Sequence, residues 1–372
     1  MTLQPPAPTV HLVAGARPNF MKVAPIIRAL QADGQLGWRL VHTGQHFDHN
    51  MSGVFFRELG IPEPDTRFDC GGGTHAAQTA RVMEAFEAHC RDTRPDAVLV
   101  VGDVNSTLAC ALVARKAGIP VAHVEAGLRS GDMAMPEEIN RRATDAICNW
   151  FFATEPAGVQ HLLREGHAAA DIFHVGHVMA DNLIHQVQQL QQTPTSALES
   201  HDLKTRLGPH YGVVTLHRPA NVDDPQALAG MVAALNRIAQ ELPLAFPVHP
   251  RTRLMLERSG LVLAAGVHLL PPQAYMSFLH LWKDAAVVIT DSGGLQEETT
   301  VLGVPCITAR DNTERPVTVD EGSNTLAGTD PAQIVALVMD TLRTGGKRGQ
   351  RPALWDGQAA VRIVQHLKER MA

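Results

Sequence analysis

Short apolar runs alternate with amphipathic segments along the whole chain of 372 residues, and few folds accommodate this order. Many of the runs, such as AVLVV at 97–101 and AVVIT at 286–290, are continuously apolar. Such runs are typical of strands that helices cover on both faces. They predict strands at Thr9–Gly15, Trp38–Gly44, Ala97–Asp103, Pro120–Gly127, Trp150–Glu155, Asp171–Gly176, Gly212–His217, Leu244–His249, Val267–Leu270, Ala286–Asp291, Val304–Ala309 and Thr325–Gly328. Segments with helical periodicity, such as Lys22–Ala32, Ala76–Ala88 and Gln226–Glu241, lie between them, so we expect an α/β fold with parallel, doubly wound sheets.

The strand–helix pattern occurs twice, on either side of a polar stretch from Gln186 to Asp202 that contains Thr-Pro-Thr-Ser. We therefore expect two Rossmann-like domains, at 1–190 and 191–355, that face each other across a cleft. Ligands of open α/β sheets bind beyond the carboxyl ends of the strands, so functional side chains are expected there.

Charge and cysteine usage limit the classes of function. Lys and Arg number 32 against 38 Asp and Glu, a formal charge of −6, which argues against a nucleic-acid partner. The five cysteines have no C-x-x-C spacing, which argues against a disulfide framework and a structural zinc site. The uncharged segment Ser259–Trp282 has the length of a membrane span, but it contains Pro271-Pro272 and reads as helix end, strand, loop and helix. The first residues lack the features of a signal peptide, so we expect no membrane partner and a cytoplasmic location.

Acidic side chains follow two predicted strands of the first half. Asp103 and Glu125 each come directly after a buried run, and Glu137 opens a helix in the segment PEEINR. Carboxylates that converge on one cleft suit acid/base chemistry. Taken singly, Asp103 could be an N-cap and Glu137 an ordinary first-turn acid. Arg17 lies at the start of another helix, where it could bind an anion or be a surface residue beside a capping turn.

The second half offers groups that suit a nucleotide. The turn Ser292–Gly294 opens a helix after a buried strand and could present backbone N–H groups to phosphate, although it is neither a Walker A nor a G-x-G-x-x-G motif. The alternative is a simple capping turn. Glu298 lies about one helical turn further on and could accept hydrogen bonds from ribose hydroxyls. His217 ends another strand, and Arg315 adds a cation. Together the two halves predict an enzyme that acts on a nucleotide sugar.

At these residues the sequence resembles the non-hydrolysing bacterial UDP-N-acetylglucosamine 2-epimerases. The resemblance covers most of the chain and is most specific in HVEAGLR with PEE-x-NR, and in TDSGG-x-QEE with ERP. It implies glycosyltransferase-B-like architecture, with a last helix at 356–371 that packs on the first domain, and a homodimer.

The resemblance also implies a reaction without metal or cofactor. A base removes the C2 proton of UDP-N-acetylglucosamine while UDP leaves C1, and UDP then adds back to 2-acetamidoglucal to give UDP-N-acetylmannosamine. A proton is delivered to C2 from the opposite face. The implied catalytic residues are Asp103, Glu125, Glu137 and His217. The implied substrate-binding residues are Arg17, Lys22, Gln273, Phe278, Ser292, Gly293, Gly294, Glu298 and Arg315, with Phe278 against uracil.

Two segments depart from the family pattern. The chain has TGQHFDHNM, with Phe47 and Asp48, where many members have T-x-Q-H-R-x-M, and it has Pro219 where they have H-R-R-E. In the allosteric members these segments help to bind a second UDP-sugar, so we expect weak or absent substrate activation. The nearest alternative function is a UDP-2,3-diacetamido-2,3-dideoxyuronate 2-epimerase. A hydrolysing 2-epimerase, a glycosyltransferase and a non-catalytic UDP-sugar-binding module are more distant alternatives.

Overall fold

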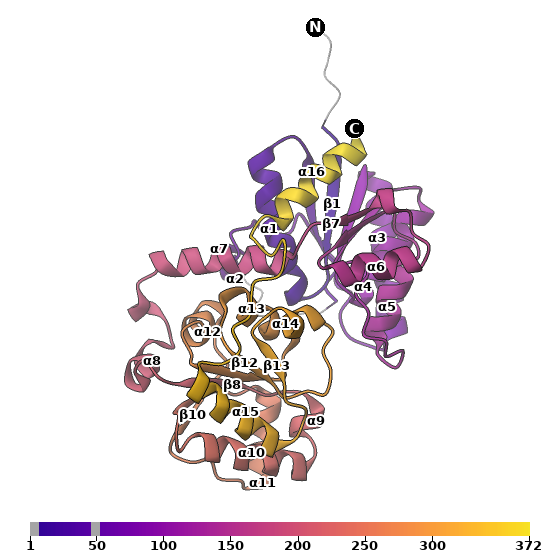
Figure 1. Ribbon diagram of the computed structural model, residues 1–372. Coiled ribbons are helices and arrows are strands. Elements are labelled where there is room, and N and C mark those ends of the chain that lie inside the picture. Colours follow the sequence, from indigo (N-terminus) through magenta and orange to yellow (C-terminus); the bar gives the residue numbers. More distant parts are fainter. Residues whose placement is uncertain (1–6, 46–52) are drawn as a thin grey trace. The chain divides into compact units, whose positions relative to one another are not determined.

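The computed structural model describes residues 7–45 and 53–372 (Figure 1). The chain divides into two compact units, of which unit 1 comprises 1–182 and 353–372 and unit 2 comprises 183–352. The first division falls inside helix α7 (Val178–Gln192), whereas the sequence placed the boundary near residue 190. The second falls between Pro352 and Ala353, close to the expected residue 355.

Unit 1 is built on a seven-stranded parallel sheet with the order β3-β2-β1-β4-β5-β6-β7. Its strands are β1 (Thr9–Ala14), β2 (Gly37–His42), β3 (Thr66–Arg67), β4 (Ala97–Val101), β5 (Val121–Val124), β6 (Trp150–Ala153) and β7 (Ile172–His174). Its helices, besides the first residues of α7, are α1 (Arg17–Asp33), α2 (Gly53–Glu58), α3 (His75–Thr93), α4 (Asn105–Lys116), α5 (Pro136–Asp145), α6 (Pro156–Arg164) and α16 (Ala359–Met371).

The central strands are apolar throughout because both of their faces are covered. In β4, Leu99 and Val101 belong to one hydrophobic cluster, with α1 and α16, and Val98 and Val100 belong to another, with α3 and α4. Because successive side chains point to opposite faces, a strand between two helical layers must be apolar at every position.

Helix α16 completes the first of these clusters. It packs against α1 (Figure 1), and its residues Ala359, Ala360, Ile363, Val364 and Leu367 are buried there. The Asp181 carboxylate accepts hydrogen bonds from the backbone N–H groups of Ala359 and Ala360, at 3.2 and 2.8 Å. The last helix thus packs on the first unit, as the family resemblance implied.

Unit 2 has a six-stranded parallel sheet with the order β10-β9-β8-β11-β12-β13. Its strands are β8 (Gly212–Thr215), β9 (Leu244–Pro247), β10 (Val267–Leu270), β11 (Val287–Thr290), β12 (Cys306–Thr308) and β13 (Asn324–Leu326). Its helices, after the remainder of α7, are α8 (His201–Leu207), α9 (Pro219–Val222), α10 (Pro225–Ile238), α11 (Pro250–Ser259), α12 (Tyr275–Trp282), α13 (Gly293–Leu302), α14 (Pro316–Asp320) and α15 (Pro331–Thr344).

The expected fold class of two parallel, Rossmann-like α/β units is confirmed. The uncharged segment Ser259–Trp282 is, as interpreted, the end of α11, strand β10, a loop and α12. Within 7–45 and 53–372, no helix combines the length and the apolar character needed to cross a membrane.

Candidate functional site

Each sheet has one point where the strand order reverses, and there the chain leaves neighbouring strands in opposite directions. In unit 1 it lies between β1 and β4, and in unit 2 between β8 and β11. Doubly wound sheets bind ligands in the crevice beside the carboxyl ends of such a pair. The predicted site residues Asp103 and His217 come shortly after β4 and β8, so each unit has candidate residues at its reversal point.

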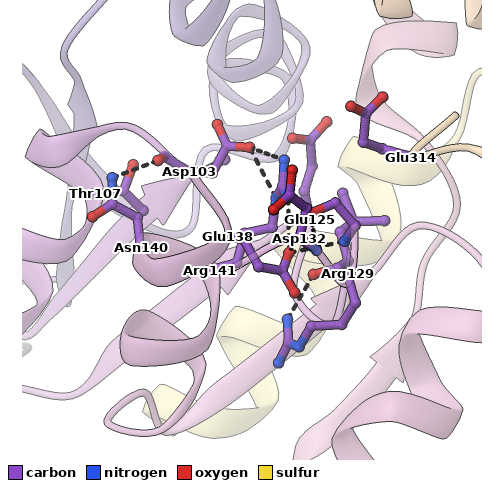
Figure 2. Close-up of polar contacts among 12 residues, drawn as sticks. Asp103, Thr107, Glu125, Arg129, Asp132, Glu138, Asn140, Arg141 and Glu314 are labelled. Carbon is purple, nitrogen blue, oxygen red and sulfur yellow. Dashed lines mark hydrogen bonds and ion pairs between the residues drawn. The ribbon is translucent and has the colours of Figure 1, made fainter. Parts of the chain in front are cut away.

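Two side chains of helix α5 hold Asp103 in place. The Arg141 guanidinium lies against Asp103 Oδ2, with Nε at 3.0 Å and Nη2 at 2.7 Å, and Asn140 donates a hydrogen bond to the Asp103 carbonyl at 2.9 Å (Figure 2). The exposed fraction of the Asp103 side chain is 28%. The carboxylate is therefore fixed in direction and still reachable from solvent.

Glu125 occupies a strained backbone position at the end of β5. Its φ is 69°, in the left-handed region that non-glycine residues rarely adopt. Its backbone N–H and that of Ala126 both donate to the Phe152 carbonyl, at 3.1 and 3.2 Å. Its carboxylate is buried, with Oε2 2.5 Å from Lys22 Nζ. Strain of this kind at a buried carboxylate is typical of functional sites.

Gly102 brings the ends of β4 and β5 close together. Its φ is 70°, and a Cβ at this position would lie 3.2 Å from Lys22 Nζ and 3.6 Å from Glu125 Oε2. A side chain there would press on the Lys22–Glu125 pair. Three predicted residues, Asp103, Glu125 and Lys22, thus surround one glycine turn.

The first turn of α5 separates two adjacent acids. Glu137 is exposed, whereas Glu138 is buried and accepts hydrogen bonds from the Ser130 backbone, Arg141 and Arg142, at 2.8, 3.0 and 3.2 Å. Burial alone would raise the pKa of Glu138, but these hydrogen bonds lower it to about 2. Glu138 orients Arg141 and so supports Asp103, a role that the sequence analysis missed. The i, i+3 spacing of Glu138 and Arg141 was the available signal.

The turn after β1 carries Arg17, which is exposed at the start of α1. Asn19 Oδ1 accepts hydrogen bonds from the backbone N–H groups of Gly15 and Ala16, at 3.1 and 3.0 Å. Its amide nitrogen donates to the Val101 carbonyl at 3.3 Å, which ties this turn to the end of β4.

In unit 2, a buried aspartate orients His217. Asp291 Oδ1 lies 2.9 Å from His217 Nδ1, and the same carboxylate accepts the backbone N–H groups of His217 and Arg218 and the side chain of Asn221. Burial raises the pKa of Asp291, but the hydrogen bonds from these groups outweigh burial and lower it below its usual value. The ionised carboxylate holds the Nδ1 proton of His217. The other ring nitrogen, Nε2, is then the atom that a ligand would meet.

A pocket of about 220 Å³ opens beside this histidine. It brings together four predicted residues, namely His217, Gln273, Phe278 and Ser292. His249, whose Nδ1 accepts the Arg251 backbone N–H at 3.2 Å, also lines it. The pocket offers an aromatic ring and polar groups within one small space, which suits a planar heterocycle.

Helix α13 begins beside the pocket with Gly293 and Gly294. Among the described residues, nothing outside their own stretch of helix lies within 4 Å of the place where a Cβ would stand on either glycine. Neither has a positive φ. Backbone conformation and packing in unit 2 therefore do not require glycine here. The bare helix N-terminus leaves room for a ligand with negative charge.

Glu298 and Arg315 both have partners within unit 2. Glu298 is buried in α13 and accepts a hydrogen bond from the Tyr275 hydroxyl at 2.9 Å. Burial raises the pKa of Glu298 to about 7, against the lowering effect of that hydrogen bond. The Arg315 guanidinium is buried against Glu297.

Comparison with known proteins decides the family. The family model described as UDP-N-acetylglucosamine 2-epimerase matches residues 28–368. The chain is 39% identical over 364 residues to the UDP-N-acetylglucosamine 2-epimerase of Methanocaldococcus jannaschii, covering 96% of this chain and 98% of that one. This chain belongs to the UDP-N-acetylglucosamine 2-epimerase family.

Two further comparisons concern a relative named for a different UDP-sugar and a solved structure. The chain is 42% identical to the UDP-2,3-diacetamido-2,3-dideoxy-D-glucuronate 2-epimerase of Pseudomonas aeruginosa, covering 95% of this chain and 98% of that one. The crystal structure of the Methanocaldococcus jannaschii enzyme in complex with UDP-GlcNAc and UDP has a TM-score of 0.85 at 38% identity, covering 97% of this chain and 99% of that one. The family is one of isomerases.

The segments that depart from the family pattern are only partly described. Phe47 and Asp48 lie outside the described residues. Pro219 begins α9, and Gln45 Oε1 accepts the Ser106 backbone N–H at 2.9 Å, where it caps α4. Weak substrate activation stays a prediction. Among 7–45 and 53–372, no group of three His, Cys, Asp or Glu side chains is placed to hold a metal ion.

Proposed function

We propose that this epimerase interconverts UDP-N-acetylglucosamine and UDP-N-acetylmannosamine by elimination and re-addition of UDP. The carboxylates of Asp103 and Glu125, which end neighbouring strands around Gly102, carry the proposal. The proposal is further supported by the 39% identity of this chain to a UDP-N-acetylglucosamine 2-epimerase.

The chemistry requires groups that exchange a proton at C2. In the elimination, a base takes the C2 proton, the C2–H electron pair forms the C1=C2 double bond, and UDP leaves C1 with the electrons of the C1–O bond. Re-addition reverses these steps, with the proton arriving on the other face of C2, so oxidation states do not change. Two acid/base groups on opposite faces are needed, each worth about 10²–10⁴-fold in rate. We propose that these two groups are among the three carboxylates of Asp103, Glu125 and Glu137.

Unit 2 is proposed to hold the nucleotide. Phe278 and Gln273 line the pocket for the uracil, and the open N-terminus of α13 at Gly293 and Gly294 would receive the diphosphate. His217, oriented by Asp291, would meet the diphosphate through Nε2. Glu298 would accept hydrogen bonds from the ribose hydroxyls, and Arg315 would supply positive charge. Arg17, at the start of α1 in unit 1, is also proposed to bind the substrate.

A second candidate substrate is the UDP-2,3-diacetamido-2,3-dideoxyuronate, because the chain is 42% identical to an epimerase of that name. Its C2 chemistry is the same, but the sugar carries an additional carboxylate. Comparison of kcat/KM for the two UDP-sugars separates the candidates.

NMR of UDP-N-acetylglucosamine incubated with the protein in D₂O tests the proposal. We expect UDP-N-acetylmannosamine with deuterium at C2. Free N-acetylmannosamine from the outset would instead indicate hydrolysis. An unchanged substrate in the presence of demonstrated UDP binding would reject the proposed sugar in favour of the diacetamido-uronate.

The variants Asp103→Asn, Glu125→Gln and Glu137→Gln test the assigned residues. Each should reduce kcat by about 10²-fold or more, because a proton-transfer group is lost while the shape of the side chain is retained. UDP affinity, measured by calorimetry, should stay near that of the wild type. The exposed Glu87 of α3 provides the matched control, and Glu87→Gln should leave kcat unchanged. Wild-type rates in all three variants would contradict the assignment.

A further inference from the structure

A buried histidine lies on the strand that Glu125 directly follows and has no place in the proposed chemistry. His123, in β5, and Asp145, at the end of α5, are both buried. His123 Nδ1 lies 2.7 Å from Asp145 Oδ1, and His123 Nε2 lies 2.8 Å from the Gly102 carbonyl oxygen. Both ring nitrogens therefore face oxygen atoms.

Those two oxygens determine the protonation of the ring. A carbonyl oxygen can only accept a hydrogen bond, so His123 Nε2 must carry a hydrogen. Asp145 Oδ2 also accepts, from the Gly127 backbone N–H at 3.0 Å and from the Arg129 guanidinium at 2.8 Å, as an ionised carboxylate does. His123 Nδ1 must then donate to Oδ1 as well, and a ring that donates from both nitrogens is an imidazolium.

The surrounding charges agree with this protonation state. Burial lowers the pKa of His123, but the charge and hydrogen bond of Asp145, the Gly102 carbonyl and the nearby Glu125 outweigh burial and raise it. Burial raises the pKa of Asp145, but His123 and Arg129 outweigh that effect and lower it. The Glu125 carboxylate is itself paired with Lys22. The Arg129 guanidinium, besides its contact with Asp145, forms an ion pair with Glu165 at 2.6 Å.

The resulting row of charges, His123⁺, Asp145⁻, Arg129⁺ and Glu165⁻, alternates in sign and sums to zero. Buried ion pairs of this kind contribute little net stability, because desolvation offsets their attraction. Their hydrogen bonds instead fix geometry. Here they hold the carbonyl of Gly102, which precedes Asp103, and the N–H of Gly127, which follows Glu125 in the same turn.

We infer that His123 is a positioning residue, an imidazolium that holds the turn carrying Asp103 directly through Nε2–H and the turn carrying Glu125 through Nδ1–H and Asp145. The inference rests on the proposed function, because it takes these carboxylates as the proton-transfer groups. A displacement of about 1 Å between such groups costs about 10²-fold in rate. The His123–Asp145 pair would therefore support kcat without contacting substrate.

The ring itself can be observed directly. In a protein labelled with ¹⁵N-histidine, the proton–nitrogen correlation spectrum of His123 should show both ring nitrogens protonated at neutral pH, where a free imidazole is mostly neutral. The variant His123→Gln identifies the signal. A neutral ring, with one nitrogen unprotonated at neutral pH, would overturn the inference. The spectrum needs no substrate, so this result stands even if the proposed reaction fails.

The variant Asp145→Asn removes the charge and keeps the shape. Its His123 ring should lose a proton at a lower pH than in the wild type, and kcat should fall as pH rises and the ring loses that proton. An unchanged pH profile with a ring that titrates would overturn the positioning role.

Kinetics separate positioning from a merely structural role. We expect His123→Gln to lower kcat by about 10- to 100-fold, with KM within about twofold of the wild type. The control is His89→Asn on α3, a buried histidine that contacts His11 at 3.0 Å. It should lower the melting temperature while kcat per folded molecule stays unchanged. A wild-type kcat in His123→Gln would contradict the inference.

Discussion

At the scale of single residues, burial and the hydrogen bond from Tyr275 act in opposite directions on the pKa of Glu298, the proposed ribose-binding residue. Burial raises the pKa of Glu298 from its usual 4.5 to about 7, although the Tyr275 hydroxyl opposes this shift. A carboxyl whose pKa is raised by folding stabilises the folded state below its unfolded pKa, and this contribution is lost as pH rises through about 7. Ribose hydroxyls prefer the ionised form, so UDP binding should have the opposite trend and strengthen above this pH.

Tyr275→Phe should therefore weaken UDP binding in a pH-dependent way. Loss of the donor raises the pKa of Glu298 further, so the affinity at about pH 7 should fall by about tenfold and recover towards about pH 9. Calorimetry at the two pH values measures the effect. The chain has two tyrosines, and Tyr211→Phe is the matched control because its hydroxyl donates to the Leu281 carbonyl. Equal losses in the two variants would contradict the assigned role of Glu298.

Residue types and motif order were sufficient to place candidate residues at the carboxyl ends of strands, but not to identify the partners of these residues. Asp103, Glu125 and His217 could be predicted because each follows a buried strand. The sequence could not tell that Glu138, rather than its neighbour Glu137, would be buried, because adjacent helical residues face different directions and only packing decides between them. Nor could it show that Lys22 would lie against Glu125 or that Asp291 would hold His217, because these pairs are far apart in the chain.

At the scale of elements, every predicted strand corresponds to an observed one, because a continuous apolar run signals a strand covered on both faces. The predicted ends of strands extend too far, as in Ala97–Asp103 against β4 (Ala97–Val101), because the residues after the strand already form the turn at the carboxyl edge of the sheet. The missed strand β3 (Thr66–Arg67) has two residues and lies at a sheet edge, where no apolar run is required.

The contact between β1 and α3 should make stability depend on pH. His11 Nδ1 and His89 Nε2 lie 3.0 Å apart, so one neutral ring donates to the other. Burial is the largest cause that lowers the pKa of His11, to about 4, and it also lowers that of His89. The unfolded rings take up protons first, so the free energy of unfolding should fall as pH drops from about 6.5 to about 4.

Urea unfolding across this pH range measures the dependence. His89→Asn should be less stable at about pH 7 by about 1 kcal/mol or more, yet lose less stability on acidification. The exposed His210 supplies the control, and His210→Asn should follow the wild-type curve. A wild-type slope in His89→Asn would show that other groups govern the acid sensitivity.

At the scale of the whole molecule, two series of strands on either side of a polar stretch were enough to predict two α/β units. The division at 182/183 could not be read from the sequence, because α7 runs unbroken from one unit into the other. Helical periodicity does not show which unit a residue packs against. Turn residues such as Thr-Pro-Thr-Ser mark only the end of the helix. The return of α16 to unit 1 came from the family resemblance rather than from any local pattern.

The buried face of α16 should contribute strongly to the stability of unit 1. Ile363 is fully buried, so Ile363→Ala should lower the free energy of unfolding by about 2–5 kcal/mol. Val361, on the same helix, is 53% exposed, and Val361→Ala should change it by less than about 0.5 kcal/mol. Chemical denaturation measures the change in the free energy of unfolding. Hydrogen exchange of the backbone amides in β1 and α1 shows whether the loss of stability is located in unit 1. Equal effects of the two variants would contradict the packing of α16.

The return of α16 also has a consequence during synthesis on the ribosome. Residues 1–182 emerge first, but the helix that completes their hydrophobic cluster follows only after the whole of unit 2. At about 5–20 residues per second, translation of unit 2 takes on the order of 10–30 seconds. During that interval the nascent first unit exposes the apolar face of α1, so chaperones that recognise such surfaces have a defined time in which to bind it.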